Sequence, residues 1–308
     1  MKTLAAILKT MRPKQWTKNL LLFAALLFAK QFTNLQAIGQ VVIAFALFCV
    51  LSGTVYLVND VVDREQDRKH PRKCKRPVAS GALSPRTAIA AAVIMAPLSI
   101  AGCFALNTAT GVVATAYLGL TLAYHFWLKH LVILDALAVA GGFVFRAVAG
   151  AEAISVVISP WLLMCTLLLA LFLSFTKRRQ EIVLLEDDAY ATRQILAEYT
   201  PHLLDQMIAT VTACTIMSYC LYTISERTVH EVGSRDLLLT IPIVIYGVFR
   251  YLYLVHRHGQ GDAPDQVLLN DMPLLVTVLV YVLAVALVFY LGAGGLGGPI
   301  LPSNNGSW

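Results

Sequence analysis

Residues 36–67 read QAIGQVVIAFALFCVLSGTVYLVNDVVDREQD, and this stretch decides the fold class. Its first part, through Val58, is apolar and has the length of about 20 residues that lets a helix cross a bilayer. Its second part places Asn59 and three aspartates, Asp60, Asp63 and Asp67, directly after the apolar run. The stretch therefore predicts an all-α membrane protein whose polar chemistry lies at one membrane surface.

The composition of the whole chain agrees with this interpretation. Of the 308 residues, 58% are hydrophobic and 14% are charged, and the mean hydropathy is +0.69. A soluble globular domain carries about 25% charged residues. The composition therefore excludes a disordered chain, a disulfide scaffold and an ordinary soluble enzyme.

The remaining sequence contains further apolar segments, which give nine predicted transmembrane helices in all. The nine segments are 20–30, 36–58, 86–106, 109–127, 132–150, 159–176, 203–225, 236–255 and 272–292. The first is short, and we predict that it becomes a full span by starting near Pro13, because proline suits the first helical turn. A cleaved signal peptide is the alternative, but no small-residue cleavage site follows the segment.

The distribution of charge predicts the orientation in the membrane. Most of the 24 Lys and Arg residues lie before the first segment or in the even-numbered loops. The positive-inside rule places these parts in the cytoplasm and, with an odd number of spans, the C-terminus outside. We expect a multi-pass protein of the inner (plasma) membrane, with one transmembrane catalytic domain over residues 1–292 and a flexible Gly-rich tail over 293–308. Small residues in the fifth segment, such as Gly150, predict close helix packing there.

The acidic cluster has the pattern NDxxDxxxD. On a continuing helix, Asp60, Asp63 and Asp67 lie at i, i+3 and i+7 and share one face, with Asn59 at its edge. Carboxylates this close repel one another unless a cation lies between them, and oxygen ligands suit Mg2+, which also takes phosphate oxygens from a substrate. The pattern predicts a magnesium site that holds a diphosphate. A solvated helix end is the alternative, although acidic residues are unfavourable at a helix C-terminus.

A basic stretch, RKHPRKCKRP at 68–77, follows the acidic cluster at once. Cations here can neutralise the phosphate oxygens that a metal leaves free, and Lys73 and Arg76 are the residues that we expect to contact substrate. Binding of anionic lipid headgroups is the alternative for the other cations.

These residues resemble the UbiA superfamily of intramembrane prenyltransferases. The resemblance implies a bundle of nine transmembrane helices around a cavity that opens to the cytoplasm, with the NDxxDxxxD motif after the second helix. Four further stretches narrow it, namely RPKQWTKN at 12–19, YHFWLKHLVILD at 124–135, KRRQE at 177–181 and RYLYLVH at 250–256. They are similar to the phosphoribosyltransferase branch of the superfamily. That similarity implies transfer of a 5-phosphoribosyl group from 5-phosphoribosyl 1-diphosphate to decaprenyl (polyprenyl) phosphate for cell-wall arabinan precursors.

The sequence departs from the general superfamily pattern after the sixth segment. Most members carry a second Asp-rich motif there, whereas this chain has KRRQE, which argues against a conventional second metal site but leaves open whether one or two Mg2+ ions bind. A phosphoribosyl donor and a lipid phosphate bring more phosphate groups into the site than a prenyl diphosphate does, and fixed cations can bind them. The candidates for this role are Lys18, Lys129, Lys177, Arg178 and Arg179. Positive-inside anchoring is the alternative for 177–179.

The expected mechanism needs few catalytic groups. Asp60, Asp63, Asp67 and Lys177 are the predicted catalytic residues, and Glu181 can orient Lys177 through an i,i+4 ion pair. The lipid phosphate is already an anion, so it can attack ribose C1 without a dedicated base.

Two residues outside the charged stretches are also candidates for substrate contact. Tyr124 is a candidate to contact the ribose or a phosphate. Arg146 lies within the fifth segment, where it must face protein or water, and it either contacts substrate or pairs with Glu152.

Two other functions remain open. Transfer of a polyprenyl group to an aromatic or quinone precursor is compatible with the fold and the acidic motif, but the basic stretch at 177–179 argues against it. A transporter would place its ionisable residues near the bilayer midplane, whereas here they cluster at one edge. No nucleic-acid partner is expected. The sequence leaves the polyprenyl chain length and the oligomeric state open.

Overall fold

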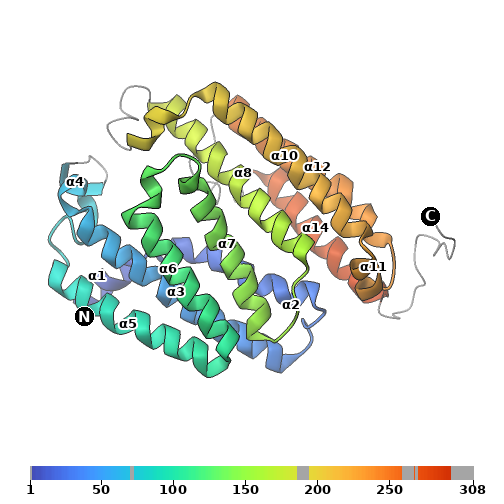
Figure 1. The fold of residues 1–308 in the computed structure, drawn as a ribbon, viewed down its shortest axis with the longest axis horizontal. Coiled ribbons are helices and arrows are strands. Elements are labelled where there is room, and N and C mark those ends of the chain that lie inside the picture. Colours follow the sequence, from blue (N-terminus) through green and yellow to red (C-terminus); the bar gives the residue numbers. More distant parts are fainter. Residues whose placement is uncertain (1, 70–72, 186–193, 259–266, 268–269, 293–308) are drawn as a thin grey trace. The chain divides into compact units, whose positions relative to one another are not determined.

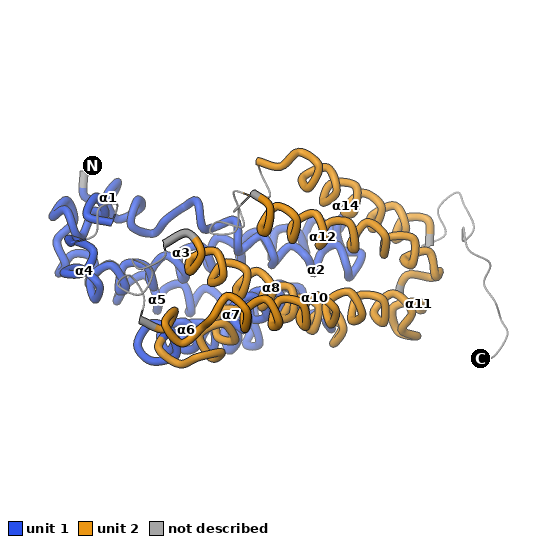
Figure 2. Tube along the Cα trace, turned by 90° about the horizontal axis from the view of Figure 1, so that it is seen from above, with its two compact units in different colours: residues 1–129, 141–158 blue, residues 130–140, 159–308 orange. Residues whose placement is uncertain are grey.

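The computed structural model describes residues 2–69, 73–185, 194–258, 267 and 270–292, and these residues form helices without a strand (Figure 1). The predicted tail at 293–308 lies outside the described residues. The chain divides into two compact units, and the prediction of one domain over 1–292 stays a prediction. Unit 1 comprises residues 1–129 and 141–158, and unit 2 comprises 130–140 and 159–308 (Figure 2). Helix α7 (Leu134–Ala153) contributes its first turns to unit 2 and the rest to unit 1.

Unit 1 is built around one long helix. Its elements are α1 (Lys2–Thr10), η1 (Pro13–Phe23), α2 (Ala24–Phe28), α3 (Leu35–Val62), α4 (Arg64–Lys69), η2 (Lys73–Lys75), α5 (Pro85–Leu106), α6 (Thr108–Phe126) and most of η3 (Leu128–His130). Helix α3 begins where the side chain of Asn34 accepts the N–H groups of Gln36 and Ala37, and α5 begins where Ser84 caps Thr87. Such caps satisfy backbone donors that have no partner within the helix.

The core of unit 1 includes the N-terminal segment. Helix α3 packs against α5, α6 and η1, and Leu22 of η1 is fully buried with Phe48 of α3 and Tyr117 of α6. A Cβ atom on Gly150 would lie 2.1 Å from the carbonyl oxygen of Leu22, so the backbones of α7 and η1 approach closely. The predicted close packing in the fifth segment is confirmed at this position.

Unit 2 is a set of long helices joined by short ones. After the start of α7, its elements are α8 (Pro160–Leu185), η4 (Gln194–Glu198), α10 (Pro201–Ile224), α11 (Glu226–Val232), η5 (Asp236–Thr240), α12 (Ile241–His258) and α14 (Met272–Gly292). Helix α8 packs along α10, and α12 packs against α14.

Among the described residues, seven helical segments are long and apolar enough to cross a membrane. They comprise α3, α5, α7, α8, α10, η5 with α12, and α14. The predicted count of nine is therefore not confirmed. The first predicted span forms the 3-10 helix η1 and the five-residue helix α2, and the 19-residue helix α6 is not among the seven.

Most predicted boundaries lie within a few residues of the observed ones, but the end of α8 differs. The helix continues to Leu185, so the stretch 177–181 is helical and the prediction of a loop there is wrong. In this continuation Arg178 and Gln180 have buried partners in unit 2, Asp135 and the carbonyl oxygen of Val255.

Replacement of Gly150 by alanine tests the contact between α7 and η1. The new Cβ would overlap a backbone atom, and overpacking of this kind costs about 1–3 kcal/mol. We expect the detergent-purified variant to melt several degrees below the unmodified protein. Gly119→Ala in α6 is the matched control, because no atom lies within 4 Å of the added Cβ there, and it should melt at or above the unmodified protein. Equal melting temperatures for the two variants would contradict the close approach.

Candidate active site

The acidic cluster lies where α3 ends and α4 begins. Asp63 caps α3, yet the N–H of Asp67 still donates to the carbonyl oxygen of Asp63 at 2.8 Å, so the helical turn continues across the break. Asp60 and Asp67 are 1% and 3% exposed. The half-buried Asp63 thus lies about one helical turn from each of the two buried carboxylates, Asp60 and Asp67. Both buried carboxylates need a compensating cation.

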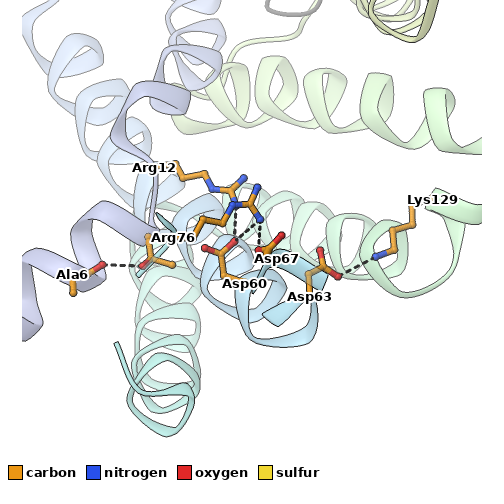
Figure 3. Close-up of polar contacts among 8 residues, drawn as sticks. Ala6, Arg12, Asp60, Asp63, Asp67, Arg76 and Lys129 are labelled. Atoms are coloured by element: carbon orange, nitrogen blue, oxygen red, sulfur yellow. Dashed lines mark hydrogen bonds and ion pairs between the residues drawn. The ribbon is translucent and has the colours of Figure 1, made fainter. Parts of the chain in front are cut away.

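Two arginines supply the positive charge for the buried pair (Figure 3). Arg12 Nη2 donates to Asp60 Oδ1 at 2.5 Å, and Arg76 Nη1 lies 3.3 Å from Asp60 Oδ1 and 2.6 Å from Asp67 Oδ2. Both carboxylates thus converge on one nitrogen atom of Arg76. The guanidinium of Arg12 also lies over the ring of Tyr56, 4.5 Å from its centre.

The third carboxylate points elsewhere. Asp63 lies 3.7 Å from Lys129 Nζ, and Figure 3 shows it directed away from the Arg12 and Arg76 side chains. The predicted common face thus holds for Asp60 and Asp67, whereas Asp63, at the helix cap, turns to a different cation. Each of the three aspartates has a cationic partner within unit 1.

Arg12 is not among the predicted site residues, although it holds Asp60, the most buried carboxylate of the acidic cluster. Its backbone is in the left-handed region, with φ 54° and ψ 67°, directly before Pro13. A proline disfavours the right-handed helical conformation for the residue before it. The chain therefore turns between α1 and η1, and this turn brings the Arg12 side chain to α3. The one available signal is the Arg-Pro pair at the start of the RPKQWTKN stretch.

The acidic cluster fits a divalent cation in one specific way. Among the described residues, no group of three His, Cys, Asp or Glu side chains is arranged to hold a metal. Asp60 and Asp67 nonetheless surround one position, which the cationic Nη1 of Arg76 occupies. Mg2+ commonly takes one or two protein carboxylates and completes its shell with water and substrate phosphates. The two carboxylates therefore suit Mg2+, with the guanidinium as its stand-in.

The other candidates of unit 1 come from separate elements. Lys18 lies on η1, Asn59 on the last turn of α3, Lys73 on η2 and Tyr124 near the end of α6. All four side chains are half-buried. Asn59 also accepts the N–H of Asp63 with its carbonyl oxygen, which helps to close the end of α3. Their contacts with substrate stay predictions.

Arg146 lies inside unit 1 and joins several helices. It is 8% exposed and donates to Asn19 Oδ1 at 2.7 Å, Tyr117 Oη at 2.8 Å and the carbonyl oxygen of Gly142 at 2.9 Å. The amide of Asn19 in turn donates to the side chains of Cys49 and Ser52 on α3. These neutral partners, rather than the Glu152 carboxylate considered above, satisfy the buried guanidinium. The geometry favours a role in holding η1 in place.

The stretch 177–181 of unit 2 has its residues directed to different neighbours. Arg178 donates to Asp135 Oδ2 at 2.7 Å, Arg179 pairs with Asp205, and Gln180 Nε2 donates to the carbonyl oxygen of Val255 at 2.6 Å. Lys177 and Glu181 form the predicted i,i+4 pair, at 3.8 Å, which is confirmed. The sequence predicts that Arg178 and Arg179 bind phosphate, but in the structure their charges are paired with Asp135 and Asp205.

Arg178 belongs to a cluster of buried polar residues that also contains Asp135 and Tyr199. Asp135 and Tyr199 are 0% and 2% exposed. Tyr199 donates to Asp135 Oδ1 at 2.8 Å and accepts the N–H of Ile133 at 2.7 Å. Burial, followed by the nearby Asp135 carboxylate, raises the pKa of Tyr199 to about 12, so the hydroxyl stays protonated and remains a donor. Neither Asp135, which ends the YHFWLKHLVILD stretch, nor Tyr199 is among the predicted site residues.

The backbone at Ile133 is strained. Its φ is 68°, in the left-handed region, which a β-branched residue rarely adopts. Such a conformation costs about 1–3 kcal/mol and persists only where surrounding contacts hold it. The hydrogen bond from Ile133 to Tyr199 is such a contact.

The sequence is similar to known proteins over nearly its whole length. Residues 20–272 match the UbiA prenyltransferase family. Decaprenyl-phosphate phosphoribosyltransferase of Corynebacterium glutamicum is 36% identical over 291 residues, which are 92% of this chain and 87% of that protein. The protein of the same name from Mycobacterium tuberculosis is 32% identical over 292 residues, which are 94% of this chain and 95% of that protein.

Solved structures share the fold. A UbiA homolog from Archaeoglobus fulgidus bound to GPP and Mg2+ has a TM-score of 0.70 at 16% identity and covers 92% of this chain and 99% of its own. A UbiA homolog from Aeropyrum pernix K1 has a TM-score of 0.56 at 18% identity, with 93% and 97% covered. The shared fold, the near-full-length relatives and the match over residues 20–272 together show that this chain belongs to the UbiA prenyltransferase family.

Proposed function

We propose that this protein is a magnesium-dependent transferase that moves the 5-phosphoribosyl group of 5-phosphoribosyl 1-diphosphate to a polyprenyl phosphate and releases diphosphate. The observation that carries the proposal is the similarity, over nearly the full length of both chains, to relatives named decaprenyl-phosphate phosphoribosyltransferase. A multi-pass membrane protein is suited to an acceptor that is a lipid.

The geometry at the end of α3 supports a substrate that carries several phosphates. Asp60 and Asp67 would hold Mg2+ at the position that Arg76 Nη1 occupies in the structure. When bound, the ion would neutralise charge on the departing diphosphate. The guanidinium groups of Arg12 and Arg76 would then bind phosphate oxygens, for which their planar forks are well shaped.

The reaction itself needs mainly positioning and charge compensation. The bond from ribose C1 to the diphosphate oxygen breaks, and a bond from C1 to an oxygen of the lipid phosphate forms. The acceptor is already an anion, so no side chain has to remove a proton. Lys18, Lys73, Tyr124, Lys129 and Lys177 would contact the phosphates or the ribose, and Glu181 would orient Lys177.

The location of the site follows from charge. We place the N-terminus and the acidic cluster at the cytoplasmic face of the plasma membrane, because the cations gather in the parts of the chain that flank this cluster. With the nine predicted spans, of which the first precedes α3, the N-terminus and the cluster share one face and the C-terminus lies outside. The product would serve as a precursor of cell-wall arabinan.

The assay for this function uses the purified protein in detergent. Labelled 5-phosphoribosyl 1-diphosphate, decaprenyl phosphate and Mg2+ should yield a labelled lipid. Asp67→Asn should lower the rate by at least about 100-fold, because it weakens the binding of Mg2+ and thereby the neutralisation of charge on the departing diphosphate. Asp271→Asn, far from the acidic cluster in the sequence, serves as the expression-matched control. A labelled lipid formed equally well by Asp67→Asn would contradict the role of the cluster.

A substrate panel separates this proposal from its alternative. Polyprenyl diphosphate with 4-hydroxybenzoate or a quinone precursor is offered to the same preparation in place of the phosphoribosyl donor. Prenylated aromatic product without any phosphoribosyl lipid would overturn the proposed function while leaving the family membership intact.

Removal of Arg76 tests whether the carboxylates accept a metal. In Arg76→Gln, Asp60 and Asp67 lose their shared cation, so the variant should melt below the unmodified protein in EDTA. Mg2+ should then raise its melting temperature more than that of the unmodified protein, because a ligand present at about 100 times its Kd contributes about 2.7 kcal/mol. Arg68→Gln, which alters a pair with the exposed Glu65, is the control and should show no added response to Mg2+. An unchanged response in Arg76→Gln would exclude this position for the ion.

A further inference from the structure

The C-terminal turns of α8 are held on several sides. Arg178 contacts Asp135 at the start of α7, and Arg179 contacts Asp205 on α10. Gln180 contacts the carbonyl oxygen of Val255 on α12. Successive residues of a helix point about 100° apart, so three neighbouring anchors take up most of the circumference. The remaining direction is that of Lys177 and Glu181, which lie about 40° apart around the axis.

Lys177 is the exposed residue of this stretch. Its side chain is 48% exposed, whereas Arg178, one residue later, is 3% exposed. A rotation of the helix end by about 100° would turn Lys177 into the direction that Arg178 has now. The orientation of Lys177 therefore depends on what holds Arg178.

Arg178 is held by a set of buried hydrogen bonds. Its Nε donates to Asp135, and its Nη1 donates to the Ser174 carbonyl oxygen at 2.7 Å. The second oxygen of Asp135 accepts from Tyr199, which in turn accepts the N–H of Ile133. Ile133, at the end of this set, has a left-handed backbone, and the hydrogen bond to Tyr199 is one of the contacts that hold it.

We propose that Asp135 and Tyr199 are positioning residues for the transfer reaction, which act by holding Arg178 so that α8 presents Lys177 and Glu181. The inference rests on the proposed function, because it assigns Lys177 to the phosphates of the substrate. It also gives Arg178 a role that differs from direct phosphate binding. Asp135 and Tyr199 themselves are buried and do not contact the reacting atoms.

The test is a double-mutant cycle that combines Tyr199→Phe with Lys177→Ala. Tyr199→Phe keeps the ring and removes only the hydroxyl, so it is the mildest way to open the set. We expect it to raise the KM for 5-phosphoribosyl 1-diphosphate roughly tenfold, with a smaller change in kcat. In the Lys177→Ala background the same substitution should have almost no further effect, because the residue through which it acts is absent.

A matched ion pair in unit 2 supplies the control. Arg250 donates to Asp271 at 2.8 Å, and Asp271→Asn breaks this pair without involving α8. Its effect on rate, whatever its size, should be the same with and without Lys177. If the Tyr199→Phe and Lys177→Ala effects on kcat/KM simply multiply, the hydroxyl has only a structural role and the proposal is overturned.

A second readout does not require turnover and separates this inference from the proposed function. The amine of Lys177 is labelled with an acylating reagent, and peptide mass spectrometry compares its rate with that of the exposed Lys75 in the same sample. Tyr199→Phe should change the ratio of the two rates, and Asp271→Asn should not. An unchanged ratio overturns the positioning role. Absence of labelled lipid from the unmodified protein overturns the proposed function instead.

Discussion

An ionised carboxylate that is buried needs a cationic partner, and this requirement organises unit 1. Asp60 and Asp67 are almost fully buried, and their partners come from two distant places in the sequence, Arg12 before η1 and Arg76 after η2. Removal of one partner from a buried ion pair costs about 3–5 kcal/mol. The N-terminal segment and the loop after α4 are thereby fixed against α3. An incoming metal could replace a guanidinium only if that guanidinium finds another anion, such as a phosphate.

The N-terminal segment is held a second time, deeper in unit 1. Arg146 reaches Asn19 on η1 and Tyr117 on α6, and Gly150 allows α7 to approach the backbone of Leu22. An arginine within a membrane span has to satisfy its donors inside the protein. Here its donors are satisfied by neutral oxygens, and these hydrogen bonds hold the segment that carries Arg12 and Lys18 against α6 and α7. The position of Arg12 therefore depends on contacts at both ends of η1.

Local patterns in the sequence predict the helices and the acidic cluster, but not the long-range pairs. Apolar runs give most helix bounds to within a few residues, and the i,i+4 spacing gives the contact between Lys177 and Glu181. The apolar run that ends before Lys177 predicts a loop there, because hydropathy does not reveal the buried partners of Arg178 and Gln180 in α8. Arg12 and Asp60 are 48 residues apart, and no local spacing pairs them. The same holds for Arg178 and Asp135. From the sequence alone the charge of Arg178 predicts a phosphate ligand, whereas in the structure it pairs with Asp135 of unit 2.

The central claim is that Asp60 and Asp67 hold a divalent ion together with a diphosphate. Mn2+ can report on this directly by electron paramagnetic resonance of the purified protein. The account predicts that bound Mn2+ increases when 5-phosphoribosyl 1-diphosphate is added, and that this increase is lost in Asp60→Asn. Mn2+ binding that ignores the diphosphate, or that persists unchanged without the Asp60 carboxylate, would contradict it.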